Sequence, residues 1–486
     1  MNSLTNEMVT FKRIERDFFE IGCKIARTLM EQFLEKADKE LRDGRDKAAL
    51  RHKGSRTTTI KTLMGEVMMK RTVYRRINES GAVEHVFLLD EALNLETIGI
   101  ISPNLAEKIL EYACEMSYRE VSKAVSELTN QRISHQGVWD VVQAAGERQA
   151  EAEKNLVKAY ANSQLAGTRE VPVLFEEADG LWLSLQGKNR RGSSHGKKEL
   201  KIGVIYEGWA QRYTSSKEYQ TVGKTAFAGY LKAEEFKDLR EAKVAEKYNT
   251  DEIQYRVLNG DGAAWIRTGH DAEGDLFQLD PYHLAKSVVR NVYDKASRRH
   301  IMKWLKTGQF EKVFGKLEEL KYQCGGLESE VKKLSVLETY LKNNLDGIVN
   351  YKERAGIEIP SPPVGVEYRN LGTMERNVNI FAKRMKGGKS WSQQGASNMS
   401  KIIALKIGKD FPERISALVS GRLSERLTER FEETLKPIKN PVKKARKSIY
   451  PVHQGKIAFI GLKQTNGREA IKSMFDLRPL SEMVYR

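Results

Sequence analysis

The stretch VPVLFEEADGLWLSLQ, residues 171–186, decides the fold of this chain. Apolar and aromatic residues fill it in short blocks or alternate, which is typical of a β-strand inside a sheet. Asp179 interrupts the apolar pattern between Ala178 and Gly180. A carboxylate in such a strand costs free energy unless it is paired or binds a metal ion. The stretch therefore predicts a strand that carries a metal-binding acid, although Asp-Gly is also a common hairpin turn.

More strands and one helix follow this stretch. The patterns predict strands over 200–210, 225–231, 252–263 and 275–280, and a helix over 232–248. Three strands in succession, then a helix and another strand, are the order of a ribonuclease-H-like α/β domain. We therefore expect an α/β fold with a ribonuclease-H-like catalytic core. From His283 to about Tyr351 the pattern is helical with charged faces, which predicts an all-helical insertion before the core resumes near Thr373.

Two further acids lie where the predicted core places functional groups. Asp261 ends a strand in the sequence NGDG, at the carboxyl edge where open α/β sheets bind ligands, although a simple glycine turn has the same sequence. Glu375 opens a predicted helix for which Thr373 is a plausible N-cap, and the helix dipole alone would favour an acid there. Phosphodiester cleavage with two magnesium ions needs such oxygen ligands, because Mg²⁺ prefers anionic oxygen. Glu176 and Glu177 compete with Asp179 for this role, and Glu177 shares its face of the strand.

Helices and a basic hairpin precede the core. Residues 9–44 have the apolar spacing of one long helix, and residues 59–76 alternate around Gly65 like a β-hairpin with a face rich in Lys and Arg. A basic hairpin can lie along phosphates, but a solvated strand face has the same pattern.

Residues 116–146 have the organisation of a helix-turn-helix. The pattern predicts a first helix from about Tyr118 to Leu128, a polar turn, and a second helix over 135–145 with Ser134 as its N-cap. In such motifs the second helix offers its N-terminal side chains to the DNA major groove. Here these would be His135, Gln136 and Trp139; an ordinary helical hairpin is the alternative.

Length, charge and composition narrow the class of protein. The 486 residues suggest two to four domains, and 40% apolar with 30% charged residues indicate a globular chain. A net charge of +17 favours a polyanionic partner such as nucleic acid, without indicating sequence specificity. No window approaches the roughly 18 apolar residues of a membrane span, and the N-terminus lacks the pattern of a secretory signal. We therefore expect a cytoplasmic protein, associated with the nucleoid when bound to DNA. The three cysteines, far apart, predict incidental or buried thiols.

Four segments together carry a resemblance to a known family. They are ADGLWLSLQG (178–187), GDGAAWI (260–266), LDPYHLAKSV (279–288) and GTMERNVNIFAKRMKGGKSWSQQGASNM (372–399). With them the chain resembles the ISLre-type transposases of bacterial insertion sequences, a group also classed as an uncharacterised protein family. These are similar to the Mutator-type transposases. The resemblance covers nearly the whole chain, and residues 372–399 are its most distinctive part.

The resemblance implies a DDE-type core in which Asp179, Asp261 and Glu375 hold two Mg²⁺ (or Mn²⁺) ions. Asp280 and His283 match an Asp-x-x-His element of such families, which implies that His283 lies near the scissile phosphate or a flipped base; a packed core histidine is the alternative. Arg376, Lys383 and Arg384, on the predicted helix of Glu375, could follow a DNA backbone. Trp304 in the insertion could stack on a base or pack in a core. The family often has an acid where this chain has Gln394 or Ser397, which favours Glu375 as the third acid.

The expected protein is therefore a DNA transposase that binds the terminal inverted repeats and the target as double-stranded DNA. It would cut and join DNA strands as a homodimer or a larger assembly. We expect no membrane partner. The alternatives are a catalytically silent DNA-binding regulator derived from a transposase, and a nuclease that cuts without joining. The expected regions are an N-terminal helix and hairpin (1–100), a helix-turn-helix domain (101–165), the first part of the core (166–282), the helical insertion (283–360), the second part of the core (361–410) and a basic C-terminal region (411–486).

Overall fold

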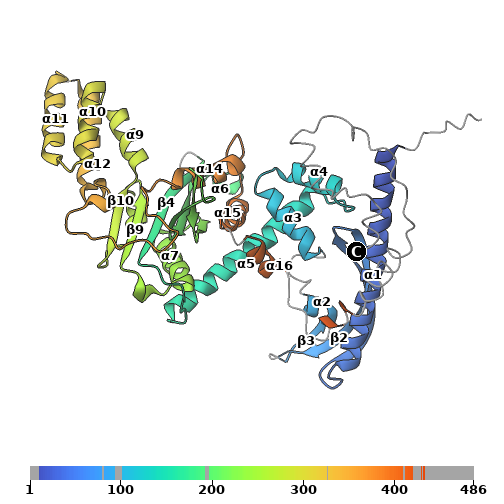
Figure 1. The fold of residues 1–486 in the computed structure, drawn as a ribbon. Helices are drawn as coiled ribbons and strands as arrows, with labels where there is room; N and C mark the ends of the chain where they lie inside the picture. Colours follow the sequence, from blue (N-terminus) through green and yellow to red (C-terminus); the bar gives the residue numbers. More distant parts are fainter. Residues whose placement is uncertain are drawn as a thin grey trace, which may run out of the picture.

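A five-stranded mixed sheet forms the centre of the molecule (Figure 1). The structure is a computed structural model that describes residues 10–78, 81–93, 101–191, 196–325, 327–408, 411–419, 428–429 and 431–432. In sheet order the strands are β10 (Asp275–Leu279), β9 (Tyr255–Gly260), β4 (Val173–Ser184), β5 (Lys197–Tyr206) and β8 (Thr225–Gly229). β4, β5 and β8 are antiparallel neighbours, whereas β9 is parallel to β4 and β10 is parallel to β9. The expectation of an α/β fold is confirmed at this level.

Helices pack on both faces of this sheet because side chains alternate along each strand. On one face, Ala178 of β4 and Ile205 of β5 belong to the same hydrophobic cluster as Phe236 and Leu239 of α7 (Ala233–Lys247). On the other face, Leu181 and Leu183 of β4 share a cluster with α14 (Met374–Met385) and α15 (Gln393–Ile407). Helices therefore cover the central strand on both faces, although Trp182 of this strand is 49% exposed.

The N-terminal part is a helix laid on a small sheet. Helix α1 (Phe11–Gly44) packs on β1 (Arg51–Thr62) and β2 (Gly65–Ile77), which β3 (Val83–Val86) and α2 (Leu88–Leu93) extend. The Asp38 carboxylate on α1 accepts hydrogen bonds from the backbone N–H and the hydroxyl of Thr72 at 2.9 and 2.6 Å. The expected long helix and hairpin are both present.

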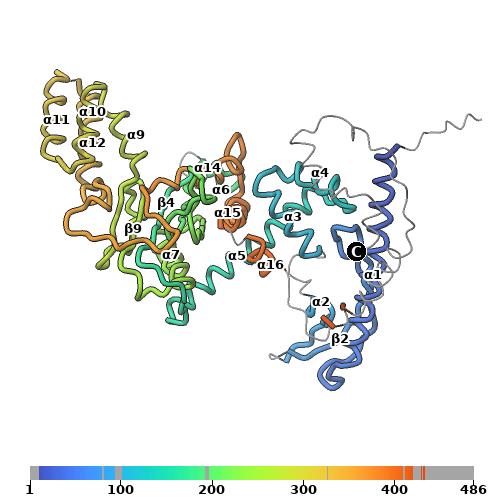
Figure 2. The backbone as a smooth tube through the Cα atoms, viewed as in Figure 1, coloured from blue at the N-terminus to red at the C-terminus, as the bar shows by residue number. Residues whose placement is uncertain are grey.

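The helix-turn-helix segment folds as expected at its start and differs at its end. Helix α3 (Pro103–Ala113) precedes α4 (Tyr118–Leu128), and α5 begins at His135 with the Ser134 side chain accepting a hydrogen bond from the Gly137 N–H at 3.1 Å. α5 continues to Ala161 rather than ending at Ala145, because its later turns pack against α7 and α15 (Figure 2). Residues of α3–α5 thus share one hydrophobic core with the central sheet.

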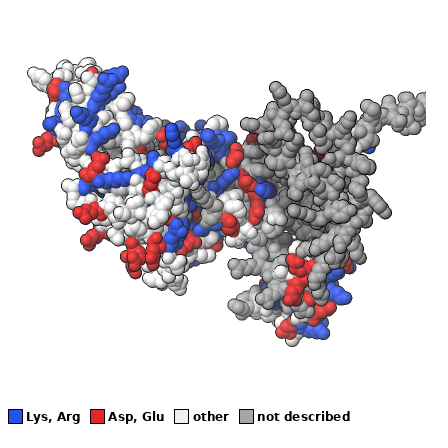
Figure 3. All heavy atoms as spheres, in the orientation of Figure 1, with Lys and Arg blue, Asp and Glu red and all other residues white. Residues whose placement is uncertain are grey.

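The helical insertion lies between β10 and α14. It consists of α9 (Pro281–Asn291), α10 (Lys295–Lys306), α11 (Phe310–Gln323), α12 (Glu328–Lys342), α13 (Leu345–Ile348) and the 3₁₀ turn η3 (Tyr351–Glu353). Helices α9–α12 project from the sheet as a separate lobe (Figure 1), with Lys and Arg side chains on its visible surface (Figure 3). Trp304 packs against the hydrophobic cluster of this lobe and stacks on His300, so the core-packing interpretation holds for it.

Short elements complete the described chain. They are α6 (Lys188–Arg191), β6 (Gly208–Gln211), β7 (Tyr219–Val222), η2 (Thr250–Glu252), α8 (Ala264–Arg267) and α16 (Phe411–Val419). Cys23, Cys114 and Cys324 are free and buried, as expected. Over the described ranges, no helix combines the length and apolar character needed to cross a membrane. The basic run at 436–447 lies outside the described residues.

The crossing of α5 and α15 provides a test of this packing. A Cβ placed on Gly146 of α5 would lie 2.4 Å from Asn398 Cβ and 2.6 Å from Asn398 Cα on α15. Gly146→Ala should therefore destabilise the protein by about 1–3 kcal/mol, the usual cost of overpacking a core. Gly315→Ala in α11 is the matched control, because a Cβ there meets nothing within 4 Å. It should stabilise its helix by about 0.5–1 kcal/mol. Chemical denaturation measures both, and equal effects of the two substitutions would contradict the close crossing.

Candidate active site

Three aspartates meet at one end of the central sheet. β4 pairs Glu177 with Asn259 of β9, so Asp179 and Asp261 stand two residues further along neighbouring strands. β9 pairs Gly260 with Leu279 of β10, which places Asp280 beside Asp261. With His283 and Glu375, these aspartates line one small hollow of about 10 Å³. The three acids selected from the sequence, 82 and 114 positions apart, therefore face the same space.

The carboxylates in this hollow influence one another. Burial raises the pKa of the Asp179 carboxyl, and the nearby charges of Asp261 and Asp280 raise it further. The Gly180 N–H, which donates to Asp179 Oδ1 at 2.7 Å, and the charge of His283 both oppose this shift. His283 Nε2 lies 3.9 Å from Asp179 Oδ2. Like charges gathered in a half-buried space favour the binding of a cation or a proton there.

Glu177 organises the elements around the hollow. Its side chain is 1% exposed. It accepts five hydrogen bonds, from Tyr206 Oη (2.6 Å), Asn259 Nδ2 (2.9 Å), Thr373 N (3.1 Å), Thr373 Oγ1 (2.7 Å) and Met374 N (3.1 Å). Two of these donors are the first backbone N–H groups at the start of α14, so the carboxylate of β4 caps that helix. A negative charge at a helix N-terminus is favourable, and here it fixes the start of the helix that carries Glu375.

The cap of α14 agrees with the sequence in position and differs in its acceptor. Thr373 is the N-cap residue, as predicted, but its side chain makes no cap hydrogen bond. The Thr373 hydroxyl donates to Glu177 instead. A charged carboxylate 196 positions away takes the role of acceptor, because it accepts hydrogen bonds more strongly than a hydroxyl does.

Asn259 connects Glu177 to the next strand. Its Nδ2 group donates both to Glu177 Oε2 and to Asp280 Oδ2, each at 2.9 Å. Asp280 in turn accepts hydrogen bonds from the N–H groups of Tyr282 and His283 and so caps α9. One hydrogen-bonded chain across β4, β9 and β10 therefore sets the positions of both Glu375 and His283.

Glu176 has a different role from its neighbours. Strand alternation turns it to the opposite face, where it forms ion pairs with Arg256 and Arg240 at 2.6 and 3.3 Å. Burial opposes its ionisation, but the charges of Arg256 and Arg240 outweigh that effect and lower the pKa of Glu176 to about 2. Both sequence competitors of Asp179 thus have structural partners, and Asp179 is the acid of β4 that faces the hollow.

The side chains that line the hollow are of the kinds that bind metal ions, but they are not placed as the ligands of one ion would be. Carboxylate oxygens are the ligands that Mg²⁺ and Mn²⁺ prefer, and mutual repulsion among the acids would be relieved by a cation. Within the described ranges, however, no three His, Cys, Asp or Glu side chains stand close enough together to hold one ion as they are placed. Glu375 is exposed at the start of α14. Binding an ion would require rotation of side chains, and the oxygen donors present fit such an ion.

The residues predicted to contact DNA fall into two groups. His135, Gln136, Arg376 and Lys383 are exposed, and Trp139 is 40% exposed beside a cavity of about 310 Å³ that Tyr118 and Trp391 also line. Arg384 differs from the prediction. It is buried, donates to the Ala113 carbonyl, and stacks on the rings of Tyr118 and Trp391. Helical periodicity turns Arg384 toward α3 and α4, so it joins α14 to those helices.

Sequence reasoning missed Glu177 and Asn259 as organising residues. Glu177 was noticed only as a rival to Asp179, and Asn259 only as part of a turn. The available signal was the polar pair in two otherwise apolar strands, because buried polar groups of this kind need partners.

The fold and the site define a mixed α/β protein in which a carboxylate inside β4 lies beside carboxylates that directly follow β9 and β10. The model of the Uncharacterised protein family (UPF0236) matches residues 4–413, and the chain belongs to that family.

Relatives of the chain carry the same family name. One UPF0236 protein of Caldanaerobacter subterraneus subsp. tengcongensis, whose name joins eleven locus designations of that organism, is 26% identical over 406 residues, 81% of this chain and 77% of the relative. A UPF0236 protein from the region 3′ of vanSb in Streptococcus gallolyticus is 25% identical over 412 residues, 79% and 80% of the two chains. Among solved structures, the Drosophila P element transposase strand transfer complex aligns with 71% of this chain and 86% of that chain, at 10% identity and a TM-score of 0.20.

Replacement of Glu177 by Gln tests the organising role of its carboxylate. The variant places an amide donor where two or three N–H or O–H groups now donate, and unsatisfied buried donors cost about 1–3 kcal/mol. We expect a loss of that size in the free energy of unfolding, measured by chemical denaturation. The control is Glu375→Gln, an exposed carboxylate on the helix that Glu177 caps, which should change stability by about 0.5 kcal/mol or less. Equal stability of the two variants would contradict the capping role of Glu177.

Proposed function

We propose that this protein is a DDE-type DNA transposase of an insertion sequence. It would bind the terminal inverted repeats, cut phosphodiester bonds at the ends of the element, and join the freed ends to target DNA. The single observation that carries this proposal is that Asp179, Asp261 and Glu375, remote in the chain, line the same hollow. Three acids of this kind are what a two-metal phosphoryl transfer site requires.

The strand arrangement supports a ribonuclease-H-like core. Three antiparallel strands (β4, β5, β8) are followed by a helix (α7) and by two strands parallel to the first. The first strand lies in the middle of the sheet. This is the arrangement inferred from the order of the sequence patterns, with the helical insertion entering after the fifth strand.

Two divalent cations, Mg²⁺ or Mn²⁺, fit the donors of the hollow. Asp179, Asp261 and Glu375 would hold them. When bound, such ions activate the attacking oxygen and neutralise charge on the leaving oxygen. The charges of Asp261 and Asp280 add to burial in raising the pKa of Asp179, and a bound cation would offset their repulsion.

The remaining groups of the site fix the positions of Glu375 and His283. Glu177 fixes the start of α14 and thereby the position of Glu375. Asp280 fixes the start of α9, so that the His283 ring stays near Asp179, where it can donate to a phosphate oxygen or hold a proton. Catalysis by such a site consists mainly of alignment and charge stabilisation.

DNA would contact the protein through several exposed side chains. His135, Gln136 and Trp139 lie at the start of α5, where a helix-turn-helix offers side chains to the major groove. Arg376 follows Glu375 directly on α14, and Lys383 lies about two turns further along the same helix; both are exposed and would bind backbone phosphates. Because two element ends must be held together for joining, the active form would be a dimer or larger.

The name of one relative supports the proposal that the gene belongs to a mobile element. A UPF0236 protein named for eleven loci of a single organism is what a repeated, mobile gene would produce. By the same reasoning, copies of the gene for this chain would be flanked by matching inverted repeats.

Substitution of Asp179 tests the catalytic assignment. Asp179→Asn keeps the size of the side chain but removes the charge that would hold a cation, and cleavage should fall by about 10³-fold or more, comparable with the removal of a key transition-state group. The purified protein is incubated with labelled DNA that flanks its own gene, with and without Mg²⁺, while end binding is measured separately. Asp251→Asn, at an exposed position away from the hollow, is the control.

Four outcomes of this assay separate the alternatives. Cleavage and joined products that need Mg²⁺ and Asp179 support the transposase. Cleavage without joined products would indicate a nuclease, and binding without cleavage a silent regulator. Full cleavage by the Asp179→Asn variant would overturn the assignment.

The pH dependence of cleavage gives an independent test. A cation can bind Asp179 only when the carboxyl is ionised, and burial raises the pKa of that carboxyl. At low Mg²⁺ concentration, activity should therefore fall with decreasing pH earlier than for an ordinary carboxylate. Because Mg²⁺ competes with the proton, raising its concentration should shift the fall to lower pH. Initial cleavage rates at several Mg²⁺ concentrations measure this. An acid limb that stays fixed as Mg²⁺ increases would contradict cation binding at Asp179.

A further inference from the structure

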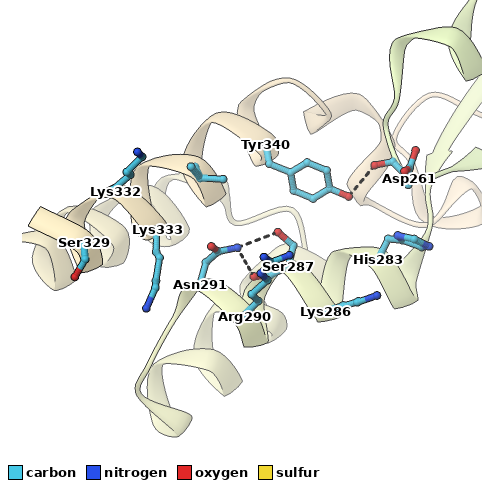
Figure 4. A pocket seen from close by; sticks show the side chains of 11 residues that line it. Asp261, His283, Lys286, Ser287, Arg290, Asn291, Ser329, Lys332, Lys333 and Tyr340 are labelled. Carbon is cyan, nitrogen blue, oxygen red and sulfur yellow. Dashed lines mark hydrogen bonds between the residues drawn. The ribbon is translucent and has the colours of Figure 1, made fainter. Parts of the chain in front are cut away.

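A groove of about 750 Å³ opens between α9 and α12, directly beside the acids (Figure 4). Asp261 and His283 stand at one end of it, so it is continuous with the hollow that they also line. From there it follows the facing sides of the two helices away from the sheet. Its lining is Asp261, His283, Lys286, Ser287, Arg290, Asn291, Ser329, Lys332, Lys333, Val336 and Tyr340.

The lining of the groove is strongly basic. Lys286 and Arg290 line the groove from α9, and Lys332 and Lys333 line it from α12, all four exposed. Asp261 is the one acid in the lining. Lys333 bonds to Glu330 at 2.7 Å. Among the residues that the structure describes, no carboxylate lies within ion-pair distance of Lys286, Arg290 or Lys332, whereas Lys316, Lys321, Lys333 and Lys342 of the same lobe each have such a partner. Cations without a carboxylate partner on both walls of a groove are suited to an anion between them.

The walls of the groove are fixed relative to the acids. The Tyr340 hydroxyl of α12 donates to the backbone carbonyl of Asp261 at 3.0 Å. α9 starts at the Asp280 cap, immediately after β10. A ligand held between the helices would therefore lie at a defined distance from Asp179 and Asp261.

We propose that this groove binds the sugar–phosphate backbone of a single DNA strand next to the scissile bond. The volume is that of a pocket for a ligand of small-molecule size, a few hundred to about 1,000 Å³, which suits a few nucleotides of one strand rather than a duplex. Ser287 and Asn291 add polar groups between the cations. The Tyr282 ring is 49% exposed at the edge of the hollow, with Lys286 Nζ 5.5 Å from its centroid, so an aromatic surface and a cation stand together where an unpaired base would stack.

This inference rests on the proposed function and extends it to the form of the substrate. The DNA end must open at the site, so that one strand runs from the acids into the groove while the other leaves. Binding to the groove is a property of Lys286, Arg290 and Lys332, and it does not require the acids to bind cations.

The test measures strand binding in the absence of Mg²⁺. A variant that combines Lys286→Ala, Arg290→Ala and Lys332→Ala is compared with one that combines Lys295→Ala, Arg299→Ala and Lys303→Ala. The control residues are exposed on α10 outside the groove, and the two variants lose the same charge. The probe is a fluorescent oligothymidylate, followed by anisotropy over a range of salt concentrations, with a duplex of equal length in parallel. Thermal unfolding confirms that both variants fold.

The groove variant should bind the single strand about a hundredfold more weakly at 0.1 M salt. Its slope of log affinity against log salt should be smaller by about 2, since each phosphate contact on a single strand contributes about 0.7. The control variant and the duplex should be affected much less.

Three results would overturn the groove assignment. They are an equal loss for both variants, an equal loss for duplex and single strand, and displacement of the oligonucleotide by single nucleotides at matched concentration. Because the binding measurement contains no Mg²⁺, absence of cleavage by the wild-type protein in the separate cleavage assay would contradict the proposed function and leave this measurement intact.

Discussion

The buried carboxylate of Glu177 is the interaction on which the geometry of this protein depends. It lies in the central strand, yet it receives the first backbone N–H groups of a helix nearly 200 residues further along the chain. A charge removed from water in this way is tolerable only when donors surround it, and five do so here. The dependence is mutual. The N–H groups of α14 satisfy the charge of Glu177 in β4, and Glu177 fixes the residue at which α14 begins.

This constraint explains how residues from four elements come to face one small space. The parallel pairing of β4, β9 and β10 fixes the relative heights of Asp179, Asp261 and Asp280. Strand pairing alone does not determine where α14 and α9 begin, because these helices approach from outside the sheet. The hydrogen bonds that join Glu177, Asn259 and Asp280 determine it, because Glu177 caps α14 and Asp280 caps α9. The helical insertion can therefore be long without disturbing the position of Glu375.

Much of this arrangement was predictable from local sequence patterns. The apolar blocks gave the five strands, the periodicities gave the long first helix and the lobe, and Ser134 marked the start of α5. What could not be predicted were the features decided by distant partners. Thr373 is the N-cap residue of α14, as expected, but Glu177 of β4 and not the Thr373 hydroxyl accepts the hydrogen bonds of the cap. Arg384 is of a residue type that commonly binds phosphate, but it is buried on the inward face of α14. The end of α5 was placed 16 residues early, since its second half is stabilised by packing against α7 and α15 rather than by its own pattern.

The length of α5 would set the distance between the DNA bases that its first turn contacts and the bond that is cut. Its 27 residues form one continuous helix of about 40 Å, given a rise of about 1.5 Å per residue. The first turn carries the exposed His135 and Gln136, while Glu153 further along the helix is buried and bonds to Lys401 of α15. In the proposed transposase, a rigid helix of this length would hold a constant distance between the base sequence that its first turn contacts and the bond that is cut.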